Sequence, residues 1–122
     1  MSARIGWACA GLLAVTALAH APSLHGELVY DDVPFILEND AVKDARRVLD
    51  WFSDPRTLAE GTPWGTIHRP LRTASYAADF AAWRLEPLGY HLTSLALHLV
   101  AVCGAFALAW RLTGDPVAAW WG

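Results

Sequence analysis

Residues 88–112 read LGYHLTSLALHLVAVCGAFALAWRL, an apolar stretch whose only charged residue is Arg111. An α-helix rises about 1.5 Å per residue, so about 20 apolar residues cross a hydrocarbon core of about 30 Å. Tyr90 and Trp110 lie near the two borders of the stretch, and such aromatic residues are enriched at membrane interfaces. The stretch therefore predicts a transmembrane helix.

A second apolar stretch, IGWACAGLLAVTALAHAPSL, covers residues 5–24 and contains no Lys, Arg, Asp or Glu. It is also long enough to cross a bilayer. Most of the charged residues lie between the two stretches, which suggests a chain divided between lipid and water. We therefore expect an all-α membrane protein with a first transmembrane helix in residues 1–25, an extracytoplasmic loop in 26–87, a second transmembrane helix in 88–112, and a turn with the start of a third hydrophobic segment in 113–122.

The flanking charges predict the orientation of the two helices. Arg4 precedes the first helix and Arg111 follows the second, so the positive-inside rule places the N-terminus in the cytoplasm and the loop outside it. We expect an integral protein of the inner (plasma) membrane. The alternative is a signal peptide cleaved after an A-x-A site at residues 17–19 or 19–21. A retained anchor is favoured because the second apolar helix needs an antiparallel partner.

The composition excludes some function classes. The 122 residues carry a formal net charge of −3 and contain no basic run, so nucleic-acid binding is unsupported. Cys9 and Cys103 lie inside the apolar stretches, where a small buried apolar residue is a more common role than a disulfide or a metal site. His91 and His98 share one helix face, which favours hydrogen bonding to other helices over a direct role with substrate.

The polar loop is expected to contain short amphipathic helices. A proline disfavours helix at the residue before it, so we expect residues 33–37 to be extended. Asn39 can cap a helix over residues 41–53, in which apolar residues recur every three or four positions. Pro70 suits the first turn of another helix, residues 70–85, which we expect to lie at the membrane interface.

Two adjacent carboxylates, Asp31 and Asp32, follow the first apolar stretch closely. Neighbouring side chains of an extended chain point in opposite directions. One aspartate could therefore face a cavity as a general base while the other binds a donor, a metal or a backbone amide. Taken alone, such a pair is more typical of a turn or a solvated surface.

A basic group lies about forty residues further along. Arg69 and Arg72 are three residues apart at a predicted helix start, so they share one side of the helix. Two guanidinium groups with helix N-terminal amides suit a phosphate or pyrophosphate, with contact to lipid head groups as the simpler alternative. His68 could add a hydrogen-bond donor or a metal ligand, although a single loop histidine is more often neither. We assign no metal ligand and leave a divalent metal open as a cofactor.

Four sequence blocks occur in one order: YDDVPFILEN (residues 30–39), WFSDPR (51–56), RPLRTASY (69–76) and PLGYHLTSLALH (87–98). Together they resemble the N-terminal part of multi-spanning GT-C-fold glycosyltransferases, and specifically the tetratricopeptide-repeat protein O-mannosyltransferase-like membrane proteins. The resemblance covers nearly the whole chain.

The resemblance implies transfer of a sugar from a polyprenyl-phosphate-linked donor to a protein, lipid or glycan acceptor outside the cytoplasm. It also implies an acidic pair after the first helix, with Asp31 as the catalytic base and Asp32 supporting it. Arg69 and Arg72, with His68, are then candidates for binding the donor phosphate.

Proteins of this kind have many crossings. The chain is accordingly expected to be an N-terminal fragment that contacts lipid and needs further transmembrane helices of the same or a partner chain. We expect it to be inactive alone. The alternative is a small non-enzymatic two-span membrane subunit that binds a partner through its aromatic loop.

Overall fold

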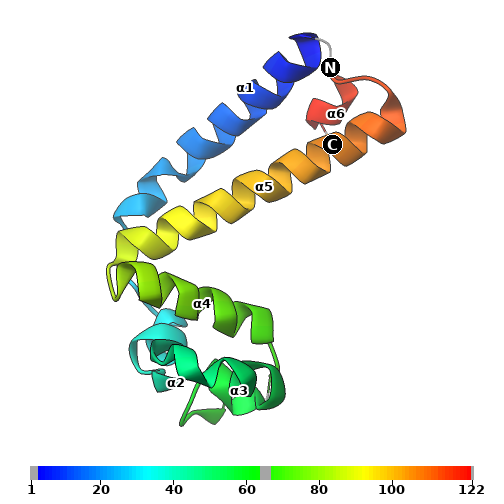
Figure 1. Cartoon of the computed structure of the whole chain (residues 1–122). Helices are drawn as coiled ribbons and strands as arrows, with labels where there is room; N and C mark the ends of the chain where they lie inside the picture. Colours follow the sequence, from blue (N-terminus) through cyan, green and yellow to red (C-terminus); the bar gives the residue numbers. More distant parts are fainter. Residues whose placement is uncertain (1–2, 64–66, 122) are drawn as a thin grey trace. The chain divides into compact units, whose positions relative to one another are not determined.

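The computed structural model describes residues 3–63 and 67–121 (Figure 1). Every regular element in these two ranges is a helix, which confirms the predicted all-α class. The chain divides into two compact units. One unit combines Met1–Leu24 with His91–Gly122, and the other is His25–Tyr90.

The first unit contains the two apolar helices. α1 (Ala3–His20) is continued by a 3₁₀ turn, η1 (Ala21–His25), and runs opposite to α5 (Pro87–Thr113), which is followed by the short α6 (Ala118–Trp121) (Figure 1). The segments Ile5–His25 and Pro87–Thr113 are each long and apolar enough to cross a membrane. This agrees with the prediction of two candidate membrane-spanning helices.

Side-chain pairs along α1 and α5 show how these helices face each other. The Sγ atoms of Cys9 and Cys103 are 4.0 Å apart, and both thiols are free. Nearer the other end of α1, the rings of His20 and His98 have centroids 4.7 Å apart. Along α1 from Cys9 to His20, the partner residue on α5 moves back from Cys103 to His98. This reversed order is the one that antiparallel helices require.

This packing predicts that mild oxidation forms a disulfide between Cys9 and Cys103, the two native cysteines of the chain. A disulfide needs the sulfurs at about 2.05 Å, so the two thiols must approach further from their observed separation of 4.0 Å. After oxidation in membranes, trypsin should cleave at exposed arginines such as Arg56, and the fragments should stay joined on a non-reducing gel. Cys103→Ser is the control. Separation of the oxidised wild-type fragments would contradict the pairing of α1 with α5.

The second unit consists of short helices. They are the π-helical turn η2 (Val33–Leu37), α2 (Asp40–Lys43), the 3₁₀ turn η3 (Ala45–Arg47), α3 (Val48–Ser53), the 3₁₀ turn η4 (Pro55–Leu58) and α4 (Pro70–Trp83). The expected extended conformation of residues 33–37 is wrong. Pro34 lies at the first turn of η2, where a missing N–H costs nothing, and the helical turn buries Phe35 and Ile36.

The prediction of one helix over residues 41–53 is also wrong, because the chain breaks at Asp44. This residue is extended (φ −117°, ψ 102°), and its carboxylate accepts the N–H of Arg46 at 3.0 Å, which starts a new turn. The break rotates the second half of the segment. Val48 and Phe52 are consequently 43% and 51% exposed, and Trp51 is buried instead.

The core of the second unit packs α4 against α2 and α3. Val42, Trp51 and Ala77 form one buried cluster, and the Trp51 Nε1–H donates to the Ala41 carbonyl at 3.0 Å. A second cluster contains Phe35, Ile36, Leu58, Ala59 and Tyr90. One face of α4 is therefore covered by protein.

The end of α4 is closed by a local turn within the second unit. Arg84 ends α4 with φ 58°, and its carbonyl accepts the hydroxyl of Tyr90 at 2.6 Å. Gly89 lies so close to the Trp83 ring that an added Cβ would overlap it. The PLGY part of the fourth sequence block thus has a structural explanation.

Candidate functional site

A tight turn at Val29–Asp32 begins the candidate site. The Asp32 N–H donates to the Val29 carbonyl at 3.0 Å, and the Asp32 carboxylate accepts the Val29 N–H at 3.1 Å. Tyr30, inside this turn, has φ 51°, in the left-handed region that bulky residues rarely adopt. Asp32 therefore closes the turn with both its backbone and its side chain.

The other aspartate of the pair faces a cavity. Asp31 is exposed and lines a hollow of about 380 Å³, a volume within the usual range of small-molecule sites. Arg69 and Arg72 line the same hollow. Three of the five predicted site residues are thus brought together, and the complete lining is Tyr30, Asp31, Pro34, Phe35, Ile67, Arg69 and Arg72.

Arg72 is held in place by two aromatic side chains. Its Nε–H donates to the Tyr76 hydroxyl at 3.0 Å, and its guanidinium carbon lies 4.2 Å from the centroid of the Phe35 ring. Such cation–π contact and hydrogen bonding fix the plane of the guanidinium group. In the described ranges no partner is found for its two terminal nitrogens, which leaves their donors available to a ligand.

Arg69 lies at the start of α4, and its carbonyl accepts the N–H groups of Arg72 and Thr73 at 3.1 and 3.2 Å. Its side chain is exposed. Among residues 3–63 and 67–121, no ion pair within 4 Å joins Asp31 to either arginine. The carboxylate and the two guanidinium groups therefore share one cavity without neutralising each other by direct contact.

Two predicted site residues lie outside this lining. Asp32 is engaged in the turn, and the His68 Nε2 lies 3.3 Å from the Trp51 carbonyl. Tyr30, Phe35 and Tyr76 are not among the residues that the sequence predicts for the site. The four-residue spacing of Arg72 and Tyr76 on one helix was a signal for the last of these.

Asn39 fastens together the segments that carry the cavity. It is fully buried, and the two hydrogens of its Nδ2 group are shared among the carbonyls of Phe35, Thr57 and Leu58, at 3.3, 3.0 and 2.9 Å from the nitrogen. Its Oδ1 accepts the Ala41 N–H at 3.0 Å, which confirms the predicted helix cap. One side chain thus ties η2, which contributes Phe35 to the cavity, to η4 and α2.

A second hollow of the same unit, about 430 Å³, has paired charges. Arg47 binds Glu60 through two hydrogen bonds of 2.9 Å, which raise the pKa of the arginine further above its already high value. Arg56 hydrogen-bonds to Asp54 and lowers the pKa of that carboxyl group. Because these charges already satisfy one another, this hollow is a weaker candidate for a charged ligand.

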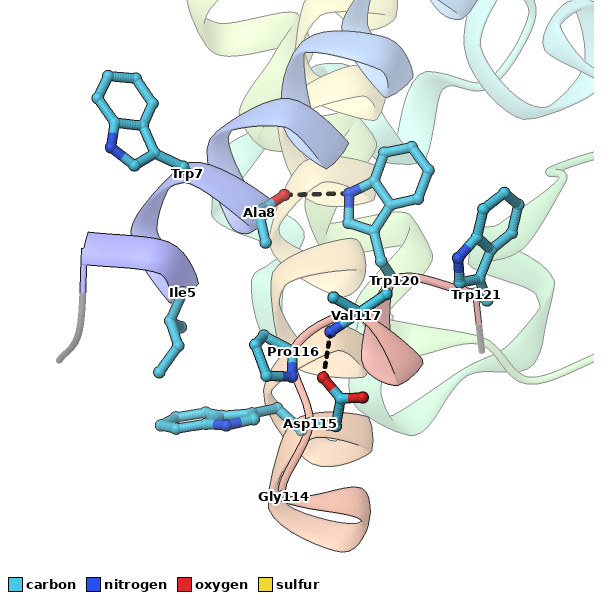
Figure 2. A pocket seen from close by; sticks show the side chains of 10 residues that line it. Ile5, Trp7, Ala8, Gly114, Asp115, Pro116, Val117, Trp120 and Trp121 are labelled. Carbon is cyan, nitrogen blue, oxygen red and sulfur yellow. Dashed lines mark hydrogen bonds between the residues drawn. The ribbon is translucent and has the colours of Figure 1, made fainter.

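The first unit has two hollows of its own. The larger, about 900 Å³, is lined by tryptophans and other apolar residues, with the Trp120 Nε1–H donating to the Ala8 carbonyl at 3.1 Å (Figure 2). The smaller, about 250 Å³, contains His91 and His98 with His20 from α1. Within the described part of the chain, no group of three or more His, Cys, Asp or Glu side chains is arranged to hold a metal ion.

Two apolar helices and the relatives of the chain define the class, a membrane protein related to glycosyltransferases. The chain is 35% identical to Protein O-mannosyl-transferase Tmtc1 of Drosophila melanogaster, in a match that covers 82% of the chain. It is 31% identical to Protein O-mannosyl-transferase Tmtc3 of the same organism, in a match that covers 69% of the chain. The chain is thus a relative of the O-mannosyltransferase-like proteins that its motifs resemble.

The similarity covers a small part of these relatives. The chain spans 12% of the length of Tmtc1 and 9% of that of Tmtc3. No family model matches the chain. No solved structure matches it either.

Proposed function

We propose that this chain contributes a catalytic surface to a GT-C-type glycosyltransferase that transfers a sugar, by analogy with its relatives mannose, from a polyprenyl-phosphate donor to an acceptor hydroxyl outside the cytoplasm. The observation that carries the proposal is the cavity shared by Asp31, Arg69 and Arg72. A carboxylate beside two guanidinium groups suits a reaction in which a hydroxyl loses a proton and a phosphate leaves.

In this mechanism the Asp31 carboxylate takes the proton of the acceptor hydroxyl. The acceptor oxygen forms a bond to the anomeric carbon of the sugar while the bond from that carbon to the phosphate oxygen breaks. The phosphate leaves with the electron pair, so its negative charge grows, and Arg69 and Arg72 stabilise it. Asp32 keeps Asp31 directed at the cavity by closing the turn.

The rest of the donor site is proposed to come from other transmembrane helices of the same or a partner chain. The 122 residues alone are expected not to transfer sugar, because they match only 12% of the length of Tmtc1 and 9% of that of Tmtc3. We propose that His25–Tyr90 lies on the extracytoplasmic side of the inner (plasma) membrane. Arg4 lies at the start of the first apolar helix and Arg111 at the end of the second, so both are at the helix ends remote from His25–Tyr90 along the chain. By the positive-inside rule these ends are cytoplasmic.

Arg72 provides a test of phosphate binding. Arg72→Gln is expected to raise the KM for the polyprenyl-phosphate mannose donor by roughly tenfold or more, because a charge-assisted bond to phosphate is lost. Arg72→Lys should restore this KM only partly, since lysine cannot reproduce the stacked, planar guanidinium. The measurement is mannose transfer to a serine- and threonine-containing peptide, in membranes that contain the rest of the bundle.

Arg46→Gln is the matched control, since Arg46 is an exposed arginine of the same unit that does not line the cavity. Its donor KM should equal that of the wild type. An unchanged donor KM in Arg72→Gln would remove Arg72 from the phosphate site. Absence of transfer by the wild type in complete membranes would count against the proposed function as a whole.

A further inference from the structure

Tyr30 has two unfavourable features at once. Its side chain is 91% exposed, and its backbone adopts φ 51°, where the Cβ of a bulky residue is crowded. Glycine adopts this conformation freely. A tyrosine here therefore costs stability, and strained residues of this kind are concentrated at functional sites.

The turn itself holds the strained backbone. The Asp32 N–H binds the Val29 carbonyl, the Asp32 carboxylate binds the Val29 N–H, and the Val33 N–H donates to the Tyr30 carbonyl at 3.2 Å. All these bonds involve backbone or Asp32 atoms. The Tyr30 ring takes no part in them, so the fold of the turn does not explain why the ring is present.

The position of the ring indicates its use. Tyr30 lines the cavity directly beside Asp31. The other aromatic residue of the lining, Phe35, has Arg72 over its ring at 4.2 Å. Tyr30 has no ring or cation contact within residues 3–63 and 67–121, so its face is available to a ligand.

We propose that the Tyr30 ring stacks on the apolar C–H face of the donor hexose and holds the anomeric carbon beside Asp31. This inference rests on the proposed function and adds the residue that recognises the sugar part of the donor. A hexose presents hydroxyl groups at its edge and C–H groups on its face, so it combines polar contacts with an aromatic surface. The cavity supplies both, with a carboxylate and guanidinium groups beside the free tyrosine ring.

Three variants separate the ring from the backbone. Tyr30→Phe keeps the ring, and its donor KM should stay within about twofold of the wild type. Tyr30→Ala should raise the donor KM roughly three- to tenfold, the range expected for loss of one aromatic contact. Tyr30→Gly should raise the donor KM equally while its thermal unfolding temperature stays equal or rises, because glycine relieves the strained φ.

Competition by polyprenyl phosphate without a sugar provides the second measurement. Its inhibition constant should be unchanged in all three variants, because only the sugar contact is altered. Phe52→Ala, at an aromatic residue of the same unit that is exposed and outside the cavity lining, is the control and should leave the donor KM unchanged.

A wild-type donor KM in Tyr30→Gly would overturn the proposed stacking of Tyr30 on the hexose. A Tyr30→Phe defect as large as that of Tyr30→Ala would overturn it too. In either result the wild type still binds and transfers, so the proposed function stands. A wild type that neither transfers the sugar nor is inhibited by polyprenyl phosphate would instead overturn the proposed function, and the stacking role of Tyr30 with it.

Discussion

Replacing Asp31 with Asn is expected to lower sugar transfer by at least about 100-fold, the usual scale for loss of a general base. Asparagine has nearly the same shape but cannot take the proton of the acceptor hydroxyl. The Asp31 side chain is exposed, and we find no side-chain partner for it among the described residues. Membrane insertion and thermal stability should therefore remain as in the wild type.

Asp32 provides the matched comparison for this experiment. Asp32→Asn keeps an oxygen that can accept the Val29 N–H, so the turn and most of the activity should be retained. Asp32→Ala removes that acceptor, and both stability and transfer should fall moderately. The measurements are the transfer rate at saturating donor and the unfolding temperature of each variant. Near-normal transfer by Asp31→Asn would exclude Asp31 as the base. A greater loss of transfer in Asp32→Asn than in Asp31→Asn would make Asp32 the base instead.

Asn39→Ala is expected to destabilise the His25–Tyr90 unit by about 2–4 kcal/mol, the largest stability effect that we predict. The substitution leaves the carbonyls of Thr57 and Leu58 and the N–H of Ala41 without the Asn39 amide as their partner. Because Asn39 is fully buried, water reaches these groups only if the structure opens. Thermal unfolding and amide hydrogen exchange within residues 25–90 would measure the effect.

Asn39→Asp distinguishes the donor from the acceptor role of this side chain. Aspartate keeps the acceptor for the Ala41 N–H, but it turns a second oxygen toward three carbonyls. We expect a loss at least as large as that of Asn39→Ala. The control is Asp40→Ala, where the side chain is 82% exposed and pairs with Lys43, a change worth about 0–1 kcal/mol. Wild-type stability in Asn39→Asp would show that the three donor contacts are unimportant.

Several elements could be predicted from local sequence. Long uncharged stretches identify the two apolar helices, because length and the cost of burying charge are properties of the segment itself. The start of α4 follows from Pro70, whose fixed φ and missing N–H suit a first helical turn. The cap at Asn39 follows from the preference of its side chain for a nearby backbone N–H.

Other elements depend on local turns or on packing that the pattern of apolar residues does not reveal. The 3.6-residue pattern over residues 41–53 was compatible with one helix, but Asp44 binds the Arg46 N–H and interrupts it. Trp51 then becomes the buried residue because its indole N–H reaches the Ala41 carbonyl. The π-helical turn of η2 likewise follows from burial of Phe35 and Ile36 against η4, which periodicity in a five-residue segment cannot reveal.

The sequence by itself determined that the chain has two membrane-crossing candidates, and it identified Asp31, Arg69 and Arg72 as residues with suitable chemistry. Only the tertiary structure decided that these three line one cavity and that His68 lies elsewhere. The physical reason is separation along the chain. About forty residues divide the aspartates from the arginines, and packing of η2 against α4 through Phe35, Arg72 and Tyr76 brings them together.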